Sequence, residues 1–136
     1  DATAPLISKA EVALLSAILQ VRDECPAALN MLRDIAVDLP AIETAVEGLA
    51  RRIDALDTRG VDVASLEFEA SYGRTSMEYY DGFVFGFYSV QKPDMPPIAT
   101  GGRYDALTRR LGGGHAIPAV GGVIRPDLVL QLRGDL

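Results

Sequence analysis

Residues 78–90 read Glu-Tyr-Tyr-Asp-Gly-Phe-Val-Phe-Gly-Phe-Tyr-Ser-Val and hold the most apolar strand that the sequence predicts. Phenylalanines stand at positions 83, 85 and 87, and Val84, Gly86 and Tyr88 fall between them. Because side chains alternate between the two faces of a strand, this strand is apolar on both faces, which is typical of a central strand. Gly86 leaves room on its face for a neighbouring segment or a ligand.

The residues around this strand predict a mainly antiparallel sheet with packed helices over residues 61–136. Before it, residues 66–72 alternate apolar and polar side chains, as in a strand covered on one side. The elements predicted after it are a proline-rich hairpin connection at 93–97 that returns to Gly101, a helix at 106–111 that ends in three glycines, a strand at 119–124 and a terminal helix from Pro126.

Residues 1–60 predict a helical segment of three helices. Ser8 and Glu11 have the capping-box spacing, so the first helix starts there. Pro26 ends or restarts a helix, Pro40 suits a first helical position, and Gly60 suits a left-handed helix end. The apolar residues that define the core faces are Val12, Leu15 and Leu19, widened by Leu14, Ile18 and Val21; then Leu29, Leu32 and Ile35; then Ile42, Val46, Leu49, Ile53 and Leu56.

Composition limits the classes of function. The chain has 136 residues, 49% apolar and 24% charged, which is the composition of a single globular domain or a fragment of one. A net charge of −6 argues against autonomous binding to nucleic acid or to an anionic membrane surface. With one cysteine, Cys25, and one histidine, the sequence predicts no internal disulfide and no metal site. Its glycine runs match neither a P-loop nor a dinucleotide-binding motif, and no cofactor is expected. We expect neither a membrane span nor a signal peptide, and therefore a soluble cytosolic protein.

Two motifs contain candidate binding residues. In Gly101-Gly102-Arg103-Tyr104-Asp105 the glycines allow close approach of the backbone to a ligand, and Arg103 suits a carboxylate or phosphate. The alternative is a tight turn whose charged side chains are solvated. In Glu78-Tyr79-Tyr80 the two phenols point to opposite faces of the sheet, with Glu78 on the side of Tyr80, and a carboxylate beside a phenol suits an ammonium or imidazole group. A solvated glutamate beside half-buried tyrosines is the alternative.

The remaining polar groups favour structural interpretations. His115 follows three glycines in a loop, so no Ser/His/Asp catalytic set is expected. Glu67 and Glu69 share one face of a strand, which suits a carboxylate pair less well than an ordinary solvated face.

Three motifs in order, at residues 78–85, 101–107 and 117–122, resemble the signature of the histidyl-tRNA synthetase catalytic fold, a class II aminoacyl-tRNA synthetase fold. The resemblance covers about residues 60–130, and the helices before it resemble that family's helical segment only loosely. It implies a partial catalytic-like domain in which Glu78, Tyr79, Tyr80, Arg103 and Tyr104 border a histidine-type pocket.

Two departures distinguish this sequence from the charging enzymes. Thr75 stands where those enzymes carry an arginine that helps to activate histidine, and Leu128 stands where an arginine holds the ATP phosphates. An apolar side chain cannot neutralise phosphate. Both losses resemble the regulatory subunit of ATP phosphoribosyltransferase, a paralogue that retains the synthetase fold but does not charge tRNA, so no catalytic residues are expected in this chain. That resemblance implies activation of a short catalytic subunit, feedback by histidine as effector in the first step of histidine biosynthesis, and a homo-oligomer within a hetero-oligomer.

The family's N-terminal portion with its earlier signature does not appear before residue 60, so we expect the chain to be a C-terminal part. Two alternatives stay open at this stage. The first is a divergent histidyl-tRNA synthetase fragment in which Arg74 replaces the missing cation, and the second is a histidine-sensing module for another partner.

Overall fold

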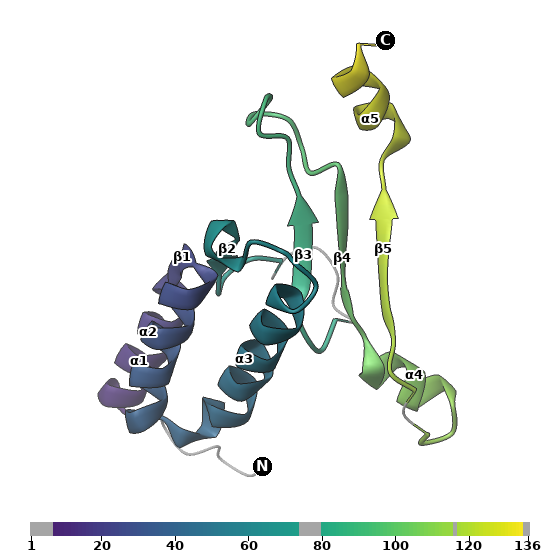
Figure 1. Ribbon diagram of the computed structural model, residues 1–136. Helices are drawn as coiled ribbons and strands as arrows, with labels where there is room; N and C mark the ends of the chain where they lie inside the picture. The colour runs from purple at the N-terminus through teal and green to yellow at the C-terminus, as the bar shows by residue number, and fades with distance from the viewer. Residues whose placement is uncertain (1–6, 74–79, 116, 135–136) are drawn as a thin grey trace. The chain divides into compact units, whose positions relative to one another are not determined.

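The structure is a computed structural model that describes residues 7–73, 80–115 and 117–134. The chain folds into two compact units, Asp1–Ser71 and Tyr72–Leu136. Each unit combines helices with antiparallel strands, which confirms the predicted mixed α/β class (Figure 1). Within the described ranges, none of the helices is long and apolar enough to cross a membrane.

In its described residues, 7–71, the first unit is built from three α-helices and a two-stranded ribbon (Figure 1). The prediction that Pro26 restarts a helix is confirmed, since it lies in the first turn of the second helix. A short strand precedes that helix and was not predicted, because three polar residues carry no strand pattern. The elements are α1 (Lys9–Gln20), β1 (Arg22–Glu24), α2 (Cys25–Asp38), the 3₁₀ turn η1 (Pro40–Ile42), α3 (Glu43–Asp57), the 3₁₀ turn η2 (Val63–Ser65) and β2 (Glu67–Glu69).

The capping box at the start of α1 is confirmed. The Glu11 amide donates to Ser8 Oγ at 3.2 Å, and the Ser8 amide donates to Glu11 Oε2 at 2.8 Å. Hydrogen bonding of the Glu11 carboxylate to Ser8, first to its backbone amide and then to its side chain, lowers the pKa of the Glu11 carboxyl. At the other end of the helical region, Gly60 adopts φ +78°, the left-handed conformation expected of it.

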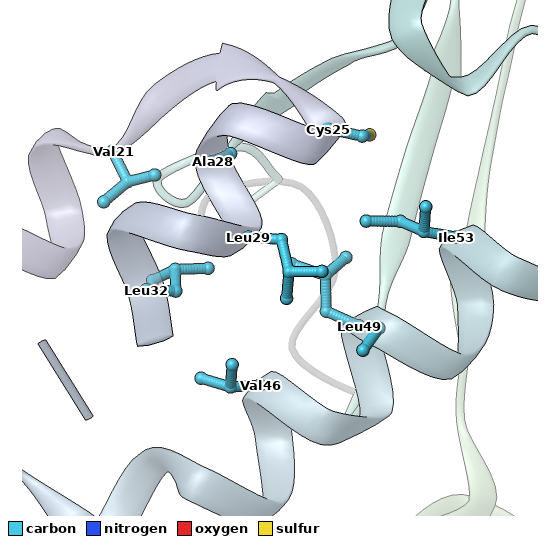
Figure 2. Packing of buried hydrophobic residues seen from close by; sticks show 9 residues of the cluster. Val21, Cys25, Ala28, Leu29, Leu32, Val46, Leu49 and Ile53 are labelled. Carbon is cyan, nitrogen blue, oxygen red and sulfur yellow. The ribbon is translucent and has the colours of Figure 1, made fainter. Parts of the chain in front are cut away.

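The core of the first unit lies between α2 and α3. Figure 2 shows Leu29, Leu32, Val46 and Leu49 pointing into the space between these two helices. This confirms the predicted faces of the second and third helices, whose spacing places apolar residues on one side. The buried members of the cluster are Val21, Cys25, Ala28, Leu29, Leu32, Val46, Leu49, Ala50 and Ile53.

The predicted core face of the first helix is wrong for Val12, Leu15 and Leu19 and is confirmed for Ile18 and Val21. Val12, Leu15 and Leu19 are 50%, 45% and 42% exposed, and no residue of α1 is buried. The helix contacts the cluster through Ile18, and Val21 after its end is fully buried. Helical spacing shows that an apolar stripe exists but not which neighbour covers it, and α2, α3 and the ribbon already enclose the core.

Residues 67–69 form a strand, but it pairs with β1 inside the first unit. Arg22 lies opposite Glu69, and Glu24 lies opposite Glu67 in the antiparallel register. Arg22 Nη2 lies 3.9 Å from a Glu67 carboxylate oxygen, and its Nη1 lies 3.8 Å from one of Glu69. On the other face Phe68 packs against the core cluster. The two glutamates therefore lie on a partly solvated face with Arg22 between them.

As far as the structure describes it, the second unit is a three-stranded antiparallel sheet with one helix in the β4–β5 connection and one after the sheet (Figure 1). The sheet order β3-β4-β5 confirms the predicted hairpin return, and the helix at 105–111 ends at the predicted glycines. The elements are β3 (Val84–Phe87), β4 (Ala99–Arg103), α4 (Asp105–Leu111), β5 (Val120–Ile124) and α5 (Pro126–Arg133).

The expected central position of the phenylalanine strand is wrong for the described part of the chain. β3 lies at the edge, and β4 lies between β3 and β5. Apolar residues on both faces indicated burial on both sides, but the strand with its backbone paired on both edges is the glycine-containing β4, where Gly101 and Gly102 are buried. The role expected of Gly86 is confirmed, because the Tyr72 hydroxyl occupies the space that a Cβ there would need.

Candidate functional site

Four glycines form a block of bare backbone across β4 and β5. Gly101 lies opposite Gly122 and Gly102 lies opposite Gly121 in the antiparallel register. Opposite residues share a face, so each face of the sheet carries one pair without side chains. The second unit therefore offers two flat backbone surfaces that larger side chains from other segments cover.

Two of the predicted site residues, Tyr80 and Tyr104, lie together on the face of Gly102 and Gly121. Their ring centroids are 6.4 Å apart with the planes tilted by 47°. A Cβ on Gly102 would lie 2.7 Å from Tyr80 Cδ1, and one on Gly121 would lie 2.8 Å from the Tyr104 hydroxyl. Both tyrosines are half-buried. The tyrosine pair, as we call Tyr80 and Tyr104, thus depends on the absence of side chains beneath it.

A second pair of tyrosines lies farther along the same face. The Tyr88 hydroxyl donates to the Tyr72 hydroxyl at 3.2 Å, and their ring centroids are 6.4 Å apart at an interplanar angle of 73°. Local sequence did not identify this contact, since the two residues are separated by the stretch that leads into β3.

Arg103 lies on the opposite face from the tyrosine pair. It follows Gly102 in β4, so the alternation of the strand places it on the side of Gly101 and Phe85. Its Nε donates to Asp105 Oδ2 at 2.9 Å, and its Nη2 lies 2.8 Å from the same oxygen. The two side chains are 37% and 25% exposed. The carboxylate partner that the sequence predicts for Arg103 is therefore supplied by the chain itself.

The Asp105 carboxylate also joins β4 to β5. Its Oδ1 accepts from the Ala119 amide at 2.8 Å, and this hydrogen bond, followed by those from Arg103, lowers the pKa of the Asp105 carboxyl. Tyr104 reinforces the junction, because its amide donates to the Ala119 carbonyl at 3.0 Å. The turn that carries Tyr104 is therefore hydrogen-bonded to both the amide and the carbonyl of Ala119.

Asp81 is a residue that the sequence analysis missed. Its Oδ1 accepts from the Asp105 amide at 3.0 Å, and its Oδ2 accepts from the Ala106 amide at 2.6 Å. It thus caps α4, whose own N-cap residue Tyr104 makes no side-chain cap. Capping motifs are recognised over three or four residues, and no local signal connects residues that lie so far apart in the chain.

Other predicted positions add no chemistry that the structure describes. Glu78 and Tyr79 lie outside the described residues, as do Arg74 and Thr75. His115 is exposed after the glycines that follow α4. In the described part of the chain, no group of three or more His, Cys, Asp or Glu side chains is placed to hold a metal ion.

Comparison with known proteins identifies the family to which the chain belongs. The family model described as histidyl-tRNA synthetase matches residues 2–129. The chain belongs to the histidyl-tRNA synthetase family. The match includes the first helices as well as the sheet, so family membership extends over more of the chain than the motifs alone indicated.

Several curated relatives of this family member carry the same name. The chain is 33% identical over 99% of its length to the ATP phosphoribosyltransferase regulatory subunits of Brucella canis and Brucella suis. It is 33% identical over 90% of its length to the protein of the same name from Agrobacterium fabrum. The chain spans about a third of the length of these relatives, 36% and 32% respectively. No solved structure matches.

One departure of this synthetase-family chain from the charging enzymes lies among the described residues. Leu128, at the position where the family resemblance expects an ATP-binding arginine, is buried in α5. The nearby Arg125 is engaged elsewhere, since its Nη1 donates to the Pro97 carbonyl at 2.9 Å and lies 3.5 Å from Thr100 Oγ1. Arg125 therefore joins the end of β5 to the β3–β4 connection.

Proposed function

We propose that the protein is a non-catalytic regulatory subunit of ATP phosphoribosyltransferase, which activates a short catalytic subunit and conveys feedback by histidine in the first step of histidine biosynthesis. The observation that carries the proposal is the shared name of relatives that align over 99% of the chain. The catalytic partner would join ATP to phosphoribosyl pyrophosphate, and the regulatory protein would form a homo-oligomer within the hetero-oligomer.

The position of Leu128 supports a role without catalysis. A buried leucine cannot neutralise ATP phosphates, and a guanidinium group is the usual means of doing so. The nearby Arg125 directs its guanidinium to the Pro97 carbonyl at the β3–β4 connection. ATP activation of an amino acid would therefore lack a cation that the charging enzymes of this family use.

The tyrosine pair supports histidine as the effector. Two phenols beside a bare backbone surface provide ring faces and hydroxyl groups for a small planar ligand, and an imidazole both donates and accepts hydrogen bonds. In this proposal Glu78, Tyr80 and Tyr104 border the ligand from one face, and a contact from Tyr79, which strand alternation predicts on the other face, stays a prediction. Arg103 acts from the opposite face by holding Asp105 and the turn that follows it.

The proposal is tested by formation of phosphoribosyl-ATP. A short-form catalytic subunit is assayed alone and with the complete protein that carries this chain, across a histidine titration. We expect the complete protein to raise the rate and histidine to suppress that increase. No change in rate with a folded protein would refute the regulatory role.

Variants connect the feedback to the site. Tyr104→Ala is expected to weaken histidine binding, whereas Tyr88→Ala, on the same face but away from Gly102 and Gly121, serves as the matched control. Histidine-dependent exchange between ATP and pyrophosphate would favour a synthetase instead. Histidine binding without any effect on the catalytic subunit would favour a sensor for another partner.

A further inference from the structure

The tyrosine pair comes from two segments that must be held together. Tyr80 precedes β3 and Tyr104 follows β4, so their ring contact depends on the relative position of the two backbones. A displacement of either segment by about 1 Å is enough to change the fit of a small ligand substantially. The question is which side chain fixes the two segments beside the rings.

Asp81, directly after Tyr80, contacts the turn on both sides of Tyr104. Its amide donates to the Arg103 carbonyl at 3.1 Å. Its two carboxylate oxygens accept from the amides of Asp105 and Ala106. One residue therefore binds the backbone before and after Tyr104 by three hydrogen bonds.

The electrostatics favour a carboxylate at this point. The amides of Asp105 and Ala106 open α4, where unpaired N–H groups and the helix dipole attract negative charge. The Asp105 carboxylate accepts hydrogen bonds from the Ala119 amide and from Arg103, so it connects the turn to the residue before β5. The two aspartates thus connect the turn after β4 to two different segments. Asp81 joins it to the segment before β3, and Asp105 joins it to the residue before β5.

We propose that Asp81 is a positioning residue of the ligand site, which holds the ring of Tyr104 against that of Tyr80 through the amides of Asp105 and Ala106. The proposal rests on the proposed histidine-binding function for its ligand, but the ring geometry that it explains does not depend on the ligand. Asp81 itself is not required to touch the ligand.

The test compares Asp81→Asn with Asp94→Asn in the complete protein. Asparagine keeps the shape of Asp81 but turns one acceptor into an amide that faces an N–H donor. Asp94 is an exposed aspartate of the β3–β4 connection and provides the matched control. The measurements are histidine affinity by calorimetry, the near-ultraviolet circular dichroism of tyrosine without ligand, and thermal unfolding to identify temperatures at which both variants are folded.

We expect Asp81→Asn to weaken histidine binding about tenfold, the order expected from loss of a hydrogen bond to a charged group, and to reduce the tyrosine signal. Asp94→Asn should change neither. Equal histidine affinities for wild type and Asp81→Asn would overturn the proposal, since a merely structural loss would appear only in the melting temperature.

Two further outcomes are also decisive. If the wild-type protein binds no histidine, the histidine part of the proposed function fails, and the tyrosine signal alone then decides: a reduction in Asp81→Asn supports the positioning role and an unchanged spectrum overturns it. If Asp81→Asn does not fold, amide hydrogen exchange in the wild type decides. Protection of the Asp105 and Ala106 amides supports the positioning role of Asp81, and exchange at the rate of free amides overturns it.

Discussion

Replacing Gly102 by alanine tests whether bare backbone in β4 is what seats the tyrosine pair. The new Cβ would lie 2.7 Å from Tyr80 Cδ1 and 2.9 Å from the Phe83 carbonyl oxygen. Carbon atoms pack comfortably at about 3.5–4.0 Å, so the Tyr80 ring must move by about 1 Å. The carbonyl of Phe83 has little freedom to follow, because it accepts the Arg103 amide at 2.9 Å.

We expect Gly102→Ala to destabilise the second unit by about 1–3 kcal/mol, the usual cost of overpacking. The sign of the change in unfolding free energy is informative, because alanine stabilises an ordinary strand position relative to glycine. Gly102 has no left-handed φ, so the effect isolates the missing space rather than backbone strain.

Tyrosine emission in a urea titration of the 136-residue chain measures this change. All five tyrosines occur from Tyr72 onward and the sequence has no tryptophan, so the tyrosine signal reports the second unit alone. With a slope of about 1 kcal/mol per M for a unit of this size, the midpoint should fall by roughly 1 M or more.

Gly48→Ala provides the matched control in the first unit. The nearest atom to a Cβ at Gly48 within α3 is Arg51 Nη2 at 4.0 Å, so alanine fits there. It should raise stability by about 1 kcal/mol in the far-ultraviolet helix signal and leave the tyrosine midpoint unchanged. An unchanged or higher tyrosine midpoint for Gly102→Ala would refute the proposed role of the bare backbone.

Three other perturbations test separate parts of the structure. Leu29→Ala should lower the free energy of unfolding of the first unit by about 2–5 kcal/mol in chemical denaturation, because it leaves a cavity in the α2–α3 core. Val37→Ala, at a 78% exposed position, should change it by no more than about 0.5 kcal/mol, and equal losses would contradict the assigned core. The folded pKa of the Asp105 carboxyl is depressed by the Ala119 amide and then Arg103, so its stabilisation is present above the ordinary aspartate pKa and is lost as the pH falls below it. Tyrosine-detected denaturation of Asp105→Asn should therefore lack this acid-dependent loss, and a pH profile equal to wild type would contradict it. Burial raises the pKa of the Cys25 thiol, so labelling by a thiol reagent at pH 8 should be slow until urea unfolds the first unit, and immediate labelling would contradict the burial.

Local sequence was sufficient for most elements of the fold. The capping box at Ser8, the helix restart at Pro26 and the left-handed Gly60 each depend on hydrogen bonds or dihedral angles within a few residues. The helices before and after β5 were predictable for the same reason, whereas Gly101 and Gly102 lie inside β4 and do not form a turn. Motif order along the chain also indicated the histidyl-tRNA synthetase family.

The site was predictable only in part. The sequence named Tyr80 and Tyr104, and the structure brings their rings together. It also named Arg103 as a ligand contact, but strand alternation places that side chain on the other face, against Asp105. Asp81 had no signal in the sequence, because both amides that it binds lie on another segment.

The sequence by itself therefore determined the periodic elements, the glycine positions and the family, since these depend on neighbouring residues or on their order. Tertiary structure alone decided that β3 lies at the edge of the sheet among the described residues, that Val12, Leu15 and Leu19 face outward, and that Asp81 caps α4. These features depend on which segment fills the space beside an element. A pattern along one strand or helix shows how many faces are apolar, but partners distant in sequence decide which face is covered and which hydrogen bond is made.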